Sequence, residues 1–231
     1  MVDDVRLGTC DSKSGGQILI KNQKFGSVEK QATIFTGENF EAIVGLAYPT
    51  LAEKDVTPVF DEMMKQKLLK NNIFAFYLTS TDMEKNGLKS DLTFGYYDKT
   101  KYEGDVHWNP VAYQYMFGVP FEDILFNGKP SNICDGNSHR CLITFDSGTS
   151  LMSMPDYATA ILSQKGVPSA DYVKKCEAEK EFGTMAFVIG GKKYELTNKE
   201  WMFPAELPML SQADQGKKSK ILFKKRGLLG P

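Results

Sequence analysis

The chain is short of the residues that build metal sites, with only four cysteines and two histidines among its 231 residues. Structural zinc sites usually need four closely spaced cysteine or histidine ligands. His139, which lies between Cys134 and Cys141, is the only histidine with cysteines nearby. Two cysteines and one histidine at these offsets do not match the usual ligand spacing, so neither a metal site nor any other cofactor is expected.

Long apolar runs and an excess of charge are also lacking. No stretch approaches the roughly 20 apolar residues of a membrane-spanning helix, and the formal net charge is -1. A soluble protein is therefore expected, with no general affinity for nucleic acid or for an acidic membrane surface. The N-terminal residues Met1 to Val5 lack the basic and apolar regions of a signal peptide. The 42% of hydrophobic residues are enough for a globular core.

Short β-leaning segments separated by turns run through the chain and predict a mainly β fold. One of them, Phe40 to Pro49, is a continuous apolar run that contains Gly45, and it is interpreted as a buried strand. Met185 to Ile189 and Lys192 to Leu196 flank two glycines and predict a hairpin. The other predicted strands are Val5–Leu7, Ile18–Ile20, Phe25–Val28, Ala32–Phe35, Ile73–Leu78, Leu92–Tyr97, Val106–Val111 and Phe121–Phe126, the last followed by an Asn127-Gly128 turn.

A few short helices are expected between these strands. Thr57 and Pro58 have the residue types of a helix N-cap and first helical position. The apolar residues that follow recur at helical spacing and predict one buried face, formed by Val59, Phe60, Met63, Met64 and Leu68. Pro155 to Gln164 predicts a second helix that Gly166 ends, and Thr197 with Glu200 has the spacing of a capping box. Residues 80–91 are polar and are interpreted as a loop.

The stretch 141–151, Cys-Leu-Ile-Thr-Phe-Asp-Ser-Gly-Thr-Ser-Leu, places one acidic residue, Asp146, in a turn of glycine and hydroxyl residues. Leu142 to Phe145 predicts a buried strand that ends at Asp146. Gly148 permits a backbone geometry or a close approach that a Cβ would block. The hydroxyls of Ser147, Thr149 and Ser150 can hydrogen-bond a carboxylate and orient it. An ordinary turn capped by its own side chains remains the alternative for these residues alone.

Two of the four cysteines lie close together in the sequence. Cys134 and Cys141 enclose six polar, turn-forming residues, which favours a small disulfide loop. Cys10 and Cys176 have no obvious local partner, so their pairing stays open.

Several motifs, in the same order, resemble those of pepsin-like aspartic endopeptidases, the family of cathepsin D and the plasmepsins. Phe40 to Pro49 resembles the segment that ends the family's N-terminal lobe. Residues 57–61, Thr-Pro-Val-Phe-Asp, resemble the start of the family's next helix. The crossover into the C-terminal lobe is resembled by three further motifs, Phe94-Gly-Tyr-Tyr, Tyr102-Glu-Gly, and Trp108 with Pro110 and Val111. Phe145-Asp-Ser-Gly-Thr-Ser resembles the catalytic loop of that second lobe, and the resemblance is collinear from about Val5 to Phe203.

The resemblance implies a bilobal, mainly β acid protease fold in which each lobe supplies one aspartate of a catalytic dyad. Asp146 would be the second-lobe catalytic aspartate. Ser147, at the position of the more common threonine, would support the catalytic loop, and Gly148 and Thr149 would bind the substrate backbone. The family also commonly has a small disulfide just before this loop, where Cys134 and Cys141 lie.

The chain departs from the family pattern at both ends. No segment resembles the first Asp-Thr-Gly-Ser loop or the flap that carries a tyrosine, and the last bracing strand of the second lobe is cut short at Pro231. The expected organisation is an N-terminal-lobe remnant (1–50), a helix and crossover strands (51–104), an incomplete C-terminal lobe (105–216) and a basic tail (217–231). That tail carries five lysines and one arginine and is interpreted as solvated and disordered.

The function implied is aspartic-type endopeptidase activity on peptide or protein substrates. With Asp146 alone, one group cannot act as base while a second acts as acid, so the isolated chain is expected to be inactive. A non-catalytic relic that binds peptides or proteins is the alternative, and a homodimer with two Asp146 loops is a third reading. The family and the disulfide imply a secretory or extracellular setting, such as an acidic, lysosome-like vesicle.

Overall fold

The computed structural model describes residues 1–8, 16–35, 40–53, 56–134, 141–149, 152–167 and 183–201. Cys10, His139, Ser150, Cys176 and the tail 217–231 lie outside these ranges, so the expectations that concern them are untested. The chain divides into two compact units, Met1–Trp108 and Asn109–Pro231. The four-part division expected from the sequence stays a prediction.

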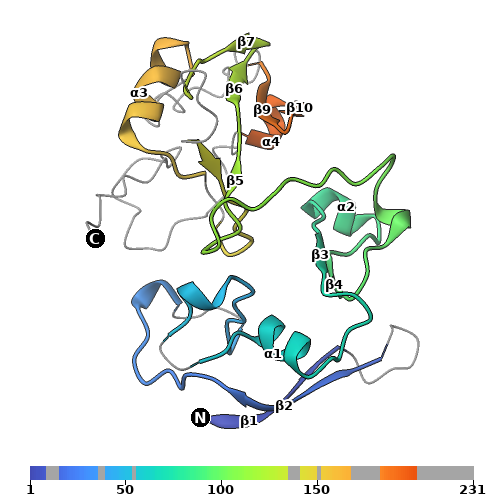
Figure 1. Cartoon of the computed structure of the whole chain (residues 1–231). Coiled ribbons are helices and arrows are strands. Elements are labelled where there is room, and N and C mark those ends of the chain that lie inside the picture. The colour runs from blue at the N-terminus through green and yellow to red at the C-terminus, as the bar shows by residue number, and fades with distance from the viewer. Residues whose placement is uncertain are drawn as a thin grey trace. The chain divides into compact units, whose positions relative to one another are not determined.

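The described residues of the first unit form two antiparallel strand pairs and two short helices (Figure 1). Strand β1 (Val2–Leu7) pairs with β2 (Ile18–Lys24), and β3 (Phe74–Tyr77) pairs with β4 (Asp91–Phe94). Helix α1 spans Val59–Lys65 and α2 spans Thr81–Lys85. The described residues of this unit also form three 3-10 turns, η1 (Thr33–Phe35), η2 (Pro49–Leu51) and η3 (Lys99–Lys101).

The core of the first unit forms where α1 meets β2, β3 and β4. Its four buried members are Ile20, Val59, Phe60 and Met63. The Phe60 ring lies 4.9 Å from the Phe74 ring in an edge-on contact, and stacks 6.4 Å from Phe94. Alternation in β3 and β4 places Phe74 and Phe94 on one face, so the helix covers that face through a single large aromatic side chain.

The second unit is built on a four-stranded antiparallel sheet in the order β10-β9-β6-β7 (Figure 1). These strands are β6 (Asp123–Phe126), β7 (Lys129–Pro130), β9 (Met185–Ile189) and β10 (Lys192–Leu196). A separate short ladder joins β5 (Val119–Pro120) to β8 (Leu142–Ile143). Helix α3 (Asp156–Gln164) packs Ala158 and Leu162 into the core, and the short helix α4 (Asn198–Trp201) contributes Trp201.

The expectation of a mainly β fold with short helices is confirmed, and several local predictions hold. The hairpin of β9 and β10 has the predicted bounds, and Asn127-Gly128 forms the turn between β6 and β7. Helix α3 is followed by Gly166, whose φ of 89° is readily accessible only to glycine. Thr197 donates both its backbone N–H and its hydroxyl to the Glu200 carboxylate, at 2.7 and 2.9 Å, which is one arm of the predicted capping interaction.

Other local predictions are wrong. Phe40 to Pro49 forms no strand, and Ile43 and Val44 are 74% and 50% exposed. No described strand pairs with this segment, and an apolar sequence without a hydrogen-bonding neighbour cannot form a sheet. Phe25–Val28 and Val106–Val111 are not strands either, and the end of Ala32–Phe35 is the turn η1.

The helix predictions also need correction. The N-cap of α1 is Pro58 and not Thr57, and the helix ends at Lys65, so Leu68 lies beyond it and is 37% exposed. Met64 is only partly buried, whereas Met63 is fully buried. The segment predicted to be a loop contains α2, which begins after Ser80 because the Ser80 hydroxyl accepts a hydrogen bond from the Met83 backbone N–H.

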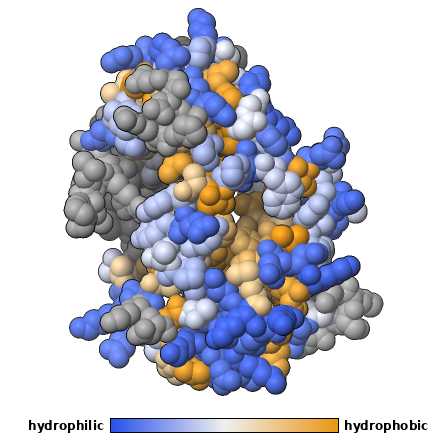
Figure 2. Space-filling view, in the orientation of Figure 1, coloured by the Kyte–Doolittle hydropathy of each residue, from blue (hydrophilic) through white to orange (hydrophobic). Residues whose placement is uncertain are grey.

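Hydrophilic residues make up most of the coloured surface in this view, and apolar residues are exposed among them at several places (Figure 2). Within the described residues no helix is both long and apolar enough to cross a membrane.

The capping interaction at α4 leads to a pH-dependent prediction. Hydrogen bonds from the Thr197 backbone and side chain lower the pKa of Glu200 below its ordinary value. Stability from this contact is therefore present above the ordinary glutamate pKa and is lost as the pH falls through the lower folded-state pKa. An NMR titration of the Glu200 carboxyl should give a pKa below the ordinary value. Thr197→Ala removes the hydroxyl donor but keeps the backbone donor, so this pKa should rise only part of the way towards the ordinary value. An unchanged pKa would contradict the hydroxyl contact.

Candidate active site

The segment that leads to Asp146 is held by a short ladder and a disulfide. In the β5–β8 ladder Val119 faces Ile143 and Pro120 faces Leu142. One step further, the Phe121 backbone N–H donates to the Cys141 carbonyl at 3.1 Å. Cys141 is bonded to Cys134 with a Cα–Cα distance of 5.7 Å, and both cysteines are buried. The predicted disulfide is therefore confirmed, and it fixes the start of β8 to the core of the second unit.

The carboxylate of Asp146 is oriented by the residues that follow it. The Gly148 backbone N–H donates to Oδ1 at 2.9 Å, and the Thr149 hydroxyl donates to Oδ2. The Thr149 backbone N–H also donates to the Asp146 carbonyl at 3.3 Å. Both oxygens thus have a donor within the turn, although the side chain itself is exposed to solvent. An exposed carboxylate with a fixed direction can meet a water molecule or a ligand without first being reoriented.

Gly148 has the close approach that its residue type suggested. A Cβ at this position would lie 3.3 Å from Asp146 Oδ1, tighter than ordinary contact. A larger residue would therefore push against the carboxylate that the backbone N–H binds. Ser147 is not among the described hydrogen-bond partners of the carboxylate.

The segment before Asp146 is not the buried strand that the sequence predicts. Strand β8 is only two residues long, and Thr144 and Phe145 lie beyond it. Phe145 is 69% exposed and Leu142 is 41% exposed. The ladder with β5 covers two residue pairs, so nothing among the described strands pairs with residues 144 and 145. Apolar composition predicted a strand here, but it could not predict how much partner strand is present.

Sequence reasoning missed a second carboxylate that shapes this region. Asp123 Oδ1 accepts hydrogen bonds from the Ser131 hydroxyl at 2.6 Å and from the Ile133 backbone N–H at 3.2 Å. Its Oδ2 accepts from the Asn132 backbone N–H at 3.1 Å. Asp123 thereby fixes the three residues that lead into Cys134. An aspartate at the start of an apolar strand, where this residue type is depleted, was the available signal.

Removing this carboxylate should destabilise the second unit. Ser131 is 3% exposed and Ile133 is 6% exposed, so their donors would lose a partner in a place that water reaches poorly. We expect Asp123→Ala to lower the free energy of unfolding by about 1–3 kcal/mol, the usual cost of buried unpaired polar groups. Urea unfolding, compared with Asp156→Ala on the exposed side of α3, measures this. An equal loss in both variants would show that the carboxylate has no special role.

Comparison with known proteins assigns most of the chain to one protein family. Residues 8–212 match the family model described as eukaryotic aspartyl protease. The chain belongs to this family. It is 34% identical over 200 residues to cathepsin D of Gallus gallus, and 33% identical over 198 residues to cathepsin E of Oryctolagus cuniculus. Each alignment covers 84% of this chain and 48% of the relative.

A third relative is a pregnancy-associated glycoprotein of Equus caballus, 36% identical over 182 residues that cover 77% of this chain and 45% of the relative. The chain thus spans about half the length of the curated relatives that it matches. In the part of the chain that the structure describes, no three histidine, cysteine, aspartate or glutamate side chains gather as metal ligands.

Proposed function

We propose that this chain contributes one of the two catalytic aspartates of an aspartic-type endopeptidase, and that this residue is Asp146. The observation that carries the proposal is the exposed Asp146 carboxylate, oriented by the Gly148 N–H and the Thr149 hydroxyl. It lies within the region that matches the aspartyl protease family. Hydrolysis by the aspartic-type mechanism needs a carboxylate that a peptide can reach.

The reaction requires a pair of carboxylates. One, ionised, accepts a proton from the attacking water, while the other, protonated, donates a hydrogen bond to the scissile carbonyl. Two carboxylates close together cannot both ionise easily, and this separates the two roles. The sequence contains one Asp-Ser-Gly and no Asp-Thr-Gly. The second carboxylate would therefore come from an N-terminal-lobe segment outside these 231 residues, and the chain by itself would be inactive.

The neighbours of Asp146 have proposed roles that follow from their positions. Thr149 and Gly148 fix the carboxylate and would also bind the substrate backbone. Ser147 would support the loop by bonding to the partner loop of the other lobe. A peptide or protein is the proposed substrate, and no nucleic acid, membrane span or cofactor is part of the proposal.

The secretory pathway or the extracellular space is the proposed location. The Cys134–Cys141 disulfide supports it, because such bonds persist in oxidising compartments. The similarity to cathepsins supports the same location. The more specific proposal is an acidic, lysosome-like vesicle.

A non-catalytic binding role is the second candidate. Ile43, Val44 and Phe145 are 74%, 50% and 69% exposed, although apolar residues of this kind are normally buried. Such residues can bind a peptide or a protein without any chemistry at Asp146.

A fusion protein tests the catalytic proposal. A first-lobe segment with an Asp-Thr-Gly loop, taken from chicken cathepsin D, would precede residue 1, and cleavage of a fluorogenic peptide would be followed at acid pH. We expect the folded fusion to cleave the peptide and pepstatin to block the cleavage. A folded fusion that binds the peptide without cleaving it would favour the binding role instead.

A further inference from the structure

Three aromatic side chains gather at the C-terminal end of the first unit, away from Asp146 in the sequence. The Tyr97 ring centroid lies 5.9 Å from that of Tyr102 and 6.2 Å from that of Trp108. The planes are inclined by 56° and 64°, so neither neighbour stacks flat on Tyr97. Because the rings are not stacked flat, part of a ring face stays available for contact with a cation.

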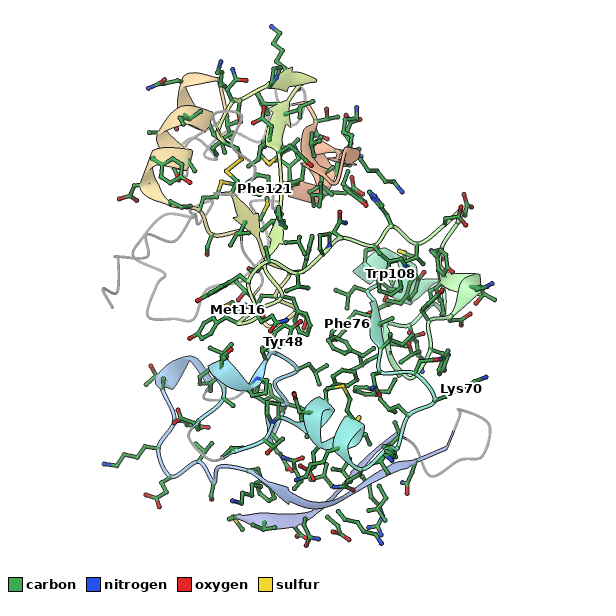
Figure 3. All side chains as sticks on the ribbon, in the orientation of Figure 1. Tyr48, Lys70, Phe76, Trp108, Met116 and Phe121 are labelled. Carbon is green, nitrogen blue, oxygen red and sulfur yellow. A yellow bond between two sulfur atoms is a disulfide. The ribbon has the colours of Figure 1, made fainter. Side chains whose placement is uncertain are left out.

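Trp108, which is labelled in Figure 3, is the most solvent-exposed side chain of the three. Its side chain is 66% exposed, whereas the other tryptophan, Trp201, is 5% exposed and lies in the core of the second unit. Tyr97 and Tyr102 are half-buried, and Tyr97 contacts both Tyr102 and the indole of Trp108. The indole of Trp108 is therefore accessible to a ligand from solution.

The electrostatics of the cluster favour a positive ligand. Loss of solvent contact raises the pKa of the Tyr102 hydroxyl above its ordinary value, and the nearby Tyr97 and Asp105 raise it further. Asp105 is exposed, and no described hydrogen bond or ion pair occupies its carboxylate. Tyr97 thus contacts both of the other rings, and the Asp105 carboxylate is close enough to Tyr102 to affect the pKa of its hydroxyl.

The neighbouring cation is held elsewhere. The Lys101 ammonium lies 4.6 Å from the centre of the Tyr77 ring and 3.3 Å from Asp91 Oδ2. These two contacts direct Lys101 to the strand pair β3–β4 and away from the cluster of Tyr97, Tyr102 and Trp108. The same unit thus already shows one cation held by a tyrosine face and a carboxylate, which is the arrangement that the cluster offers to a ligand.

We propose that Tyr97, Tyr102 and Trp108, with Asp105, form a cation cage that binds an alkylammonium or guanidinium group. The ring faces bind the cation through their quadrupoles within about 6 Å, and the carboxylate adds an ionic contact. The group could belong to a small quaternary ammonium compound or to an arginine side chain, which share this chemistry. This site is independent of catalysis at Asp146.

Ligand-detected NMR on the 231-residue chain tests the cage with two cations and their neutral isosteres. The cations are choline and blocked arginine, and the isosteres are 3,3-dimethylbutanol and blocked citrulline. We expect millimolar binding of at least one cation, with its isostere at least about fivefold weaker. The tighter of the two cations identifies the source of the group. Equal binding of a cation and its isostere, or no binding of either cation, would overturn the proposal.

Matched variants locate the binding. Trp108→Ala should weaken the cation about fivefold to tenfold, and Asp105→Asn, which leaves the rings in place, should weaken it by a smaller factor. Tyr157→Ala removes an aromatic ring that is 55% exposed on α3 and should change nothing. If Trp108→Ala and Asp105→Asn bind like the unchanged chain, the cage does not exist.

Discussion

Asp146→Asn should reduce pepstatin-sensitive peptide cleavage by the fusion protein by about 10²–10⁴-fold, the usual contribution of a general acid or base. Asparagine keeps the shape, and its amide oxygen can still accept the hydrogen bond from the Gly148 N–H. Its amide nitrogen cannot accept the Thr149 bond, but it can donate to the Thr149 hydroxyl, which then becomes the acceptor. Asparagine cannot take a proton from water, so binding of the peptide should change far less than turnover. The measurement is kcat and KM at acid pH for both proteins.

A neighbouring carboxylate provides the control for this variant. Asp156 begins α3 in the same unit and is exposed. Asp156→Asn removes the same charge and should leave kcat within about twofold, because it is not part of the proposed dyad. A similar loss of activity in both variants would mean that net charge, and not the Asp146 carboxylate, limits the reaction.

The largest effect on stability is expected from Met63→Ala. Met63 is 0% exposed and lies at the centre of the small core of the first unit, beside Ile20 and Phe60. Truncating a fully buried methionine removes its apolar contacts and leaves a cavity, at a cost of about 2–5 kcal/mol. The second unit has its own core, so hydrogen exchange of the β1 and β2 amides should report the loss while β9 amides stay protected.

Met64 is the matched control on the same helix. It has the same chemistry and the adjacent position in α1, but it is only partly buried against the core. Met64→Ala should therefore cost about 1 kcal/mol, within the ordinary range for single substitutions. Equal losses in the two variants would contradict the burial pattern.

Elements with local causes were predictable from the sequence. The β9–β10 hairpin, the Asn127-Gly128 turn and the Thr197–Glu200 contact depend on residues a few positions apart. The disulfide between Cys134 and Cys141 was favoured for the same reason. Turn geometry and capping are set within one turn of chain, so short patterns are enough to predict them.

Elements that need distant partners were not predictable. Phe40 to Pro49 and the end of 142–145 are apolar, yet neither has a described strand beside it to complete a sheet. Composition indicates what a segment would do in a full sheet, but pairing decides whether it becomes a strand. The Asp123 contacts to Ser131 and Ile133 were missed because they join residues eight and ten positions apart.

At the candidate site, too, contacts within the turn were predictable from the sequence, and features that depend on distant partners were not. The Asp-Ser-Gly-Thr stretch indicated a carboxylate held by its neighbours, and the Gly148 and Thr149 hydrogen bonds have that form. The exposure of Phe145 and the absence of a described bond from Ser147 to the carboxylate were not predictable, because both depend on what lies opposite the loop.

Peptide cleavage by the isolated 231-residue chain is the most direct test of the central claim, that Asp146 is one carboxylate of a dyad whose partner lies outside these residues. Purified chain, with its Cys134–Cys141 disulfide formed, would be incubated with a fluorogenic peptide at acid pH, with and without pepstatin. We predict no pepstatin-sensitive cleavage. Cleavage that pepstatin blocks and that Asp146→Asn abolishes would contradict the claim.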